Sequence, residues 1–189
     1  MSDLIQDFLK SVGPSFSAQA AAALNLNAST VEKMLPQLAP LIITGLKKQK
    51  DEFGGPARID HIINKYGNVS ALANIGSLFA EMSKQKADAT LGGLLGSAGT
   101  KAAEILAKQY KIKTDQVAKL ITFLSPVLLG YLAKARDTGA GLNGIAALLD
   151  RNGDGSNFDD VAGYLLGGSG NKTVEAVGTL LGGLLKKKK

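Results

Sequence analysis

Six residues that can supply oxygen ligands to a metal ion lie close together near the C-terminal end of the sequence. Residues 150–156 read DRNGDGS. Asp150, Asn152 and Asp154 have the spacing of positions one, three and five of an EF-hand calcium loop, and Gly155 stands at position six, where the chain must turn sharply. Hard divalent cations prefer such oxygen atoms, so the sequence predicts a calcium-type site. Its expected ligands are Asp150, Asn152, Asp154, Ser156 through its carbonyl, Asp159 and Asp160.

The end of this loop departs from an EF-hand. Position twelve, where an EF-hand has a bidentate glutamate, is Val161, so the loop must close differently and bind the ion more weakly. A metal-free alternative stays open, in which Ser156 caps the following helix and Asp159 reaches back to complete a capping box. Four carboxylates within eleven residues repel one another unless something neutralises them, and this repulsion favours a bound cation.

The acidic loop belongs to a sequence unit that occurs twice. Residues 31–49, VEKMLPQLAPLIITGLKKQ, align without a gap with residues 117–135, VAKLITFLSPVLLGYLAKA, at an offset of 86 residues. The offset places Pro40 on Pro126, and it extends in both directions along the chain. The sequence therefore predicts a tandem duplication. Its parts are a first unit over residues 1–86, a second over 87–172 with the acidic loop at 150–160, and residues 173–189, a C-terminal helix that resembles the start of a third unit and ends in a basic tail.

An all-α fold is expected for both units. Trp is absent, only 5% of the residues are aromatic, and Ala, Leu and Gly dominate, a composition that suits closely packed helices better than a sheet. Each unit should contain four or five helices. The repeated stretch is apolar almost all round, which predicts a central buried helix, while Pro36 and Pro40 should kink or split it. This run is too short and too interrupted to cross a membrane.

Ser and Thr residues in front of the apolar runs predict where helices begin. Ser29 is the expected cap of the first central helix, Thr114 or Asp115 that of the second, and Ser70 that of a later helix in the first unit. The loop that corresponds to the acidic loop runs from residue 64 to 70, reads NKYGNVS, and has no carboxylate. We therefore expect at most one cation site in the chain.

Several classes of enzyme are excluded by what the sequence lacks. There is no cysteine, which removes disulfides, thiolate metal sites and cysteine nucleophiles. The single histidine, His61, has no nucleophile motif beside it, and no phosphate-binding or metalloprotease motif is present. We expect a protein without catalytic residues.

The net charge of +6 is concentrated at one end, since residues 186–189 are four lysines. Non-specific nucleic-acid binding through this tail stays an alternative, whereas base-specific reading is not expected, because the helices after the two helix-turn-helix-like corners soon become apolar. Contact of the tail with a membrane surface is possible but not favoured. The N-terminus has no signal-peptide pattern, so a cytoplasmic location is expected, with export by another route left open.

The repeated LLG stretches, the central helix of the form LxPLLLGxL and the DxNGDGS loop before a final helix together resemble the YidB-like bacterial domain family. The resemblance is strongest over residues 117–167. It implies a bacterial, all-helical protein and carries no mechanism, because the function of that family is unknown.

Our preferred hypothesis is a non-enzymatic structural protein that self-associates, either into an open filament or a ring. Residues 174–185 would dock on the first unit of a neighbouring chain as residues 88–99 dock within the chain, which makes a homo-oligomer through the C-terminal helix. The alternative is a monomeric, calcium-stabilised module that binds a protein or an envelope partner.

Overall fold

The computed structural model describes residues 2–140, which are helical in all their regular segments, as expected for an all-α fold. The predicted cation ligands and the C-terminal helix, within residues 141–189, lie outside the described residues. The helices are α1 (Ser2–Ser11), α2 (Gly13–Leu24), α3 (Ala28–Phe53), α4 (Gly55–Tyr66), α5 (Val69–Ala73), α6 (Ile75–Met82), α7 (Ser97–Tyr110), α8 (Thr114–Ala135) and the short π-helical turn η1 (Arg136–Ala140).

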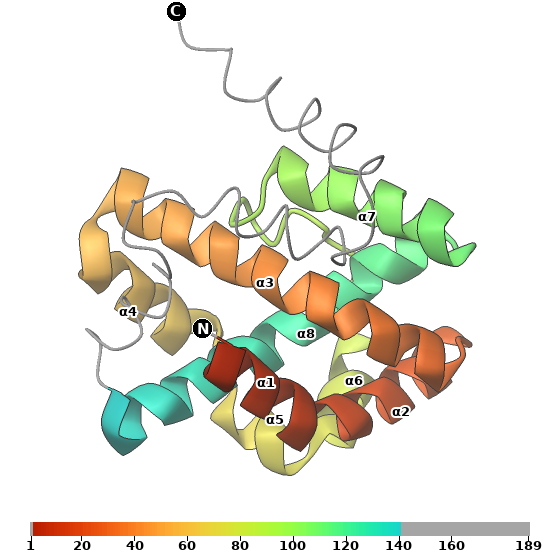
Figure 1. Ribbon diagram of the computed structural model, residues 1–189, viewed down its shortest axis with the longest axis horizontal. Helices are drawn as coiled ribbons and strands as arrows, with labels where there is room; N and C mark the ends of the chain where they lie inside the picture. The colour runs from red at the N-terminus through yellow and green to blue at the C-terminus, as the bar shows by residue number, and fades with distance from the viewer. Residues whose placement is uncertain (1, 141–189) are drawn as a thin grey trace, which may run out of the picture.

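The two long helices, α3 and α8, cross near the middle of the described part of the molecule, and the shorter helices pack around them (Figure 1). Pro36 and Pro40 were expected to kink or split this helix; they do not split α3, which runs unbroken from residue 28 to 53. A proline inside a helix costs about 3 kcal/mol. This cost is offset by packing, since the side chains of Leu38, Ile42 and Leu46 are completely buried and each such burial contributes about 1.5–3 kcal/mol.

One stretch of the described chain, Thr114–Gly139, is long and apolar enough to cross a membrane by length and composition, so the expectation that the repeated run is too short to do so is wrong for its second copy. In this fold 67% of its apolar window is buried inside the protein. Val117, Leu120 and Leu124 have no exposed surface. Such burial is what the central helix of a helical domain shows, and it matches the sequence expectation of a core helix.

The pair α2–α3 corresponds residue by residue to the pair α7–α8 at the 86-residue offset. Each first helix ends at a residue in the left-handed conformation, Asn25 with φ 52° and Lys111 with φ 55°. The next amide donates back to the carbonyl five residues earlier, over 2.9 Å in the first pair and 3.0 Å in the second. This is the hydrogen bond of a Schellman motif, and it turns both chains through the same corner.

The helix caps differ from the sequence expectation. The side chain of Asn27 caps α3 by accepting a hydrogen bond from the amide of the second residue after it, at 2.9 Å. In α8 the backbone amide of Lys113 donates to the Gln116 side chain, also at 2.9 Å. The left-handed corner places each cap four residues before the first buried apolar side chain, Val31 or Val117, so the true caps precede the expected ones. The three expected residues, Ser29, Thr114 and Asp115, lie inside the first turns of their helices.

The first unit has six helices, α1 to α6, rather than four or five. The extra boundary is at Asn74, whose extended backbone separates α5 from α6. Its side chain accepts a hydrogen bond from the amide of Ser77 at 3.1 Å, which starts the new helix.

Each half of the described chain packs on the central helix of the other half. The Phe8 ring of α1 lies edge-on against the Tyr131 ring of α8, with the ring centroids 5.3 Å apart. The segment between α6 and α7 lies on α3 at Gly45, where an added Cβ would come within 2.7 Å of Leu95 and 3.2 Å of Leu94. Phe8 and Leu94 are 86 residues apart, as are Gly45 and Tyr131. The two contacts are therefore corresponding contacts, and both contribute to one shared core.

Candidate functional site

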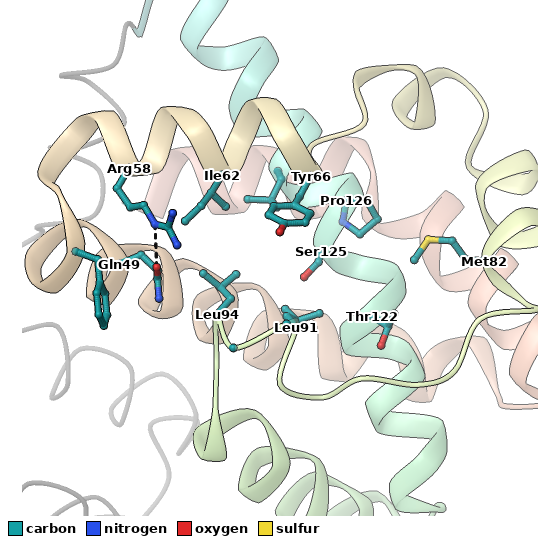
Figure 2. Close-up of a pocket in the computed structure, with 14 residues that line it drawn as sticks. Gln49, Arg58, Ile62, Tyr66, Met82, Leu91, Leu94, Thr122, Ser125 and Pro126 are labelled. Atoms are coloured by element: carbon teal, nitrogen blue, oxygen red, sulfur yellow. Dashed lines mark hydrogen bonds between the residues drawn. The ribbon is translucent and has the colours of Figure 1, made fainter.

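An apolar groove of about 510 Å³ lies beside the crossing of α3 and α8. Its walls are α3 and α4 on two sides, the turn of residues 91–94 on a third, and the middle of α8 as a floor (Figure 2). Phe53 and Tyr66 line it although they are 60% and 55% exposed, whereas Ile62 and Leu129 are buried. The volume falls in the range of roughly 300–1,000 Å³ that is usual for sites of small organic ligands.

A few polar groups stand among these apolar side chains. The Ser125 side chain is 7% exposed, and its hydroxyl oxygen is buried without a hydrogen-bond partner in the described structure. Figure 2 shows the Ser125 and Tyr66 hydroxyls directed into the space between α4 and the 91–94 turn. At one end Arg58 donates from Nε to the Gln49 side chain at 3.1 Å. The other two nitrogen atoms of the Arg58 guanidinium have no carboxylate within ion-pair distance among the described residues.

The turn that forms one wall is shaped by Asp88. Its carboxylate accepts hydrogen bonds from the Thr90 hydroxyl at 2.6 Å, the Thr90 amide at 2.8 Å and the Gly92 amide at 2.7 Å. The Thr90 hydroxyl above all, and then the Gly92 amide, hold the pKa of Asp88 below its ordinary value. Leu91 adopts a left-handed φ of 49°, which is unfavourable for a residue with a branched side chain, and this network holds it there.

Thr122 fixes the same turn to the floor. Its hydroxyl accepts a hydrogen bond from the Asp88 amide at 2.9 Å and donates to the Ala118 carbonyl within α8 at 2.8 Å. The wall of the groove is thus attached to the helix that supplies its floor.

The position of α4 over α8 is set by a contact between two backbones. A Cβ on Gly67, after α4, would lie 3.0 Å from the Leu129 carbonyl of α8, and a Cβ on Gly130, in α8, would lie 2.4 Å from the Asn68 carbonyl oxygen. The Asn68 amide donates to the Pro126 carbonyl at 3.0 Å. Only glycine permits this approach, so the two glycines set the width of the groove.

A polar cluster fastens the far side of α4. The Arg136 guanidinium pairs with the Asp60 carboxylate and donates to the Asn64 side-chain oxygen at 2.9 Å. The hydrogen bond from Arg136 to Asp137, assisted by the charges of Asp137 and Asp60, raises the pKa of Arg136. The cluster keeps α4 in contact with the end of α8.

The six predicted cation ligands, Asp150, Asn152, Asp154, Ser156, Asp159 and Asp160, lie outside the described residues. The corresponding positions of the first unit are described, and two of them are helix caps. Asn68 accepts from the Ala71 amide at 2.9 Å and starts α5, and Asn74 starts α6. Ser70, the cap expected from the sequence, lies inside α5 instead.

Two of the four acidic residues therefore have capping counterparts. Asp154 stands 86 residues after Asn68, and Asp160 stands 86 residues after Asn74. Aspartate and asparagine are about equally good N-caps. The first unit therefore suggests a metal-free alternative for these two aspartates, as helix caps, but both lie outside the described part of the chain.

Within residues 2–140 no three potential metal ligands of the His, Cys, Asp and Glu types gather in one place. His61 is exposed on α4. The basic tail of residues 186–189 is outside the described part of the chain. Sequence reasoning missed the groove, because its residues come from five separate segments. One available signal was Ser125, a polar residue at the position that Ala39 holds in the first central helix.

An all-helical core, two corresponding helix pairs and a groove beside the crossing of the long helices define a class of helical domain. The chain belongs to the DUF937 family, described as bacterial proteins of unknown function, whose family model matches residues 6–135. The matched region crosses the boundary between the two sequence units and ends before the acidic loop. No curated protein and no solved structure matches the chain.

Proposed function

We propose that the protein is a non-enzymatic binding module whose groove takes a single-chain amphiphile with an anionic head group. One observation carries this proposal: a buried hydroxyl without a partner, that of Ser125, faces an apolar groove of ligand size that ends at an arginine. A buried polar group that lacks a hydrogen bond costs about 1–3 kcal/mol. A bound ligand with a polar atom at this point recovers that cost.

The charge at the end of the groove selects the sign of the head group. Arg58 offers the donors that Gln49 does not use, and a guanidinium binds a carboxylate or a phosphate through paired hydrogen bonds. The apolar chain of the ligand then lies over Leu91, Leu94 and Leu129. A hydrogen bond to a charged group contributes about 1.5–3 kcal/mol, or roughly tenfold or more in affinity.

Calorimetric titration with dodecanoate, and separately with dodecylammonium, tests the proposal. Dodecanoate should bind more tightly, and Arg58→Gln should weaken it about tenfold or more, whereas Lys108→Gln on the outer face of α7 should change nothing. A dodecanoate that carries a hydroxyl part-way along its chain should bind more tightly than dodecanoate itself, and Ser125→Ala should remove that difference without unfolding the protein. Equal binding of the two ions, or binding that Arg58→Gln leaves unchanged, would refute the anionic ligand, and an apolar peptide would become the better candidate.

Three finer proposals accompany this one. We propose that the corresponding helix pairs arose by tandem duplication of a unit of about 86 residues, supported by the matching corners at Asn25 and Lys111. Within its family, the second central helix, which reads LSPVLLGYL over residues 124–132, supports a YidB-like member. We also propose one calcium-type site in the acidic loop of residues 150–160, supported by the spacing of Asp150, Asn152 and Asp154.

A further inference from the structure

The two ends of the groove differ in chemistry. At one end lie Gln49 and Arg58, and Arg58 is the one charged side chain among the described residues that line the groove. At the other end Figure 2 shows Met82, the last residue of α6, and Thr122 of α8. The Ser125 hydroxyl lies between the two ends. The groove therefore gives a bound amphiphile a direction, with its head group at the arginine and its tail toward α6.

The end near α6 suits the terminal methyl of an alkyl chain. The Thr122 hydroxyl is already engaged, because it accepts from the Asp88 amide at 2.9 Å and donates to the Ala118 carbonyl at 2.8 Å. The other side chains of this end, those of Met82 and Pro126, are a thioether and an aliphatic ring. An alkyl chain that reaches this end therefore deprives no polar side chain of a hydrogen bond.

Tight packing closes the groove behind Met82, which lines it although it is only 8% exposed. One turn earlier in α6, the Phe79 ring lies edge-on against two other rings. Its centroid is 4.7 Å from that of Phe123 in α8 and 5.2 Å from that of Phe16 in α2. Such interiors are packed as densely as organic crystals and yield little. The Met82 side chain, unbranched and adaptable, is the one part of this end that can move.

We propose that Met82 sets the length of the alkyl chain that the groove accepts, because the terminal methyl meets its thioether when the head group is at Arg58. The inference rests on the proposed function and adds a specificity-determining residue to it. Each methylene that enters the groove should tighten binding about fourfold. Once the chain reaches Met82, a further methylene must displace this side chain or draw the head group away from Arg58. The increase in affinity should therefore stop at a definite chain length.

Shortening Met82 should lengthen the groove at this end alone. In Met82→Ala the apolar space left by the thioether can be filled by the ligand itself, as apolar cavities bind apolar molecules. The first chain beyond the natural limit should then bind about fourfold more tightly than it binds the natural protein. Leu91→Ala is the matched control, because it removes as many heavy atoms from the side wall. It should weaken binding of every chain and leave the limiting length unchanged.

Calorimetric titration with a series of saturated carboxylates, from octanoate to hexadecanoate, tests the proposal. Each carboxylate is used below the concentration at which it forms micelles. The natural chain, Met82→Ala and Leu91→Ala are compared, and far-UV circular dichroism verifies that each variant is folded. Met82→Val is the milder variant should Met82→Ala unfold the protein, and its shorter side chain should move the limit in the same direction.

A limiting chain length that moves to longer chains in the Met82 variants, and stays in place in Leu91→Ala, supports the proposal. Affinity that rises through the whole series in the natural chain overturns it. So does a limit that is unchanged in a folded Met82 variant or that moves equally in Leu91→Ala. In these cases dodecanoate still binds and Arg58→Gln still weakens it, so the proposed function stands. Failure of the natural chain to bind any carboxylate refutes the proposed function and this inference together.

Discussion

The contact between Gly130 and the turn after α4 should be among the least tolerant points of this fold. In Gly130→Ala the added Cβ would lie 2.4 Å from the Asn68 carbonyl oxygen, 2.6 Å from its carbon and 3.0 Å from the Val69 nitrogen. Favourable contacts need about 3.5–4.0 Å. The turn must therefore move back by roughly 1 Å relative to α8. All three nearest atoms belong to the backbone, so no rotamer change relieves the clash.

Two costs and one gain determine how much free energy of unfolding Gly130→Ala loses. Overpacking a close contact costs about 1–3 kcal/mol, and moving the turn weakens the hydrogen bond from Asn68 to Pro126, worth about 0.5–1.5 kcal/mol. Replacing a helical glycine by alanine returns up to about 1 kcal/mol. We expect a net loss of about 1–3 kcal/mol, which lowers Tm by about 2–4 °C for each kcal/mol in a chain of this size.

Gly76→Ala is the matched control. Gly76 is also a glycine within a helix, α6, but its added Cβ would meet only side chains, at 3.5 Å or more. We expect this variant to be as stable as the natural chain or up to about 1 kcal/mol more stable. Urea unfolding followed by far-UV circular dichroism compares the two. If Gly130→Ala proves as stable as Gly76→Ala, the contact is not the close approach described here and the reasoning is wrong.

Three further predictions follow from single side chains. Calcium at a hundredfold excess over Kd should stabilise the natural chain by about 2.7 kcal/mol and raise its Tm. Asp154→Asn should abolish this rise in Tm but keep a cap like that of Asn68, whereas Asp154→Ala should also lose about 1 kcal/mol of stability in the absence of metal. A calcium response that survives in Asp154→Asn would contradict the proposed site. Asp88 has a lowered pKa in the folded state, so its stabilising contribution is present above the ordinary value of 3.8 and disappears as the pH falls below it; Asp88→Asn should flatten the acid side of the stability profile measured by denaturant titration, and an unchanged profile would exclude this role. Ser125→Ala should leave thermal stability unchanged or raise it by up to about 1 kcal/mol, because the hydroxyl has no partner to lose; a large loss in calorimetry would show that it has one.

The fold class and the central helices were predictable from the sequence because burial leaves a local pattern. The apolar run around Leu38 and its copy around Leu124 identified both core helices. The effect of Pro36 was not predictable, since whether a proline splits a helix depends on how much packing energy surrounds it. The caps at Asn27 and Asn68 were missed in favour of nearby serines, because cap preference differs little between these residue types.

The groove could not be predicted, because it is a property of tertiary packing. Ile62, Leu94 and Leu129 come from distant parts of the chain, and nothing in their local sequence indicates that they face one opening. The repeat did contain long-range information of another kind. Once the structure had shown that Phe8 packs on Tyr131, the 86-residue offset related this contact to the contact between Leu94 and Gly45.

The reciprocal packing of the two halves has a consequence for how the protein is made on the ribosome. Phe8 is among the first residues synthesised, but its partner Tyr131 appears more than a hundred residues later. Until α8 has emerged, α1 can pack on α2 and α3, but Phe8 lacks the Tyr131 ring and the turn at Gly67 lacks the α8 backbone. The nascent first half therefore exposes apolar surface that only the second half can cover, and we expect it to require protection by a chaperone until the chain is almost complete.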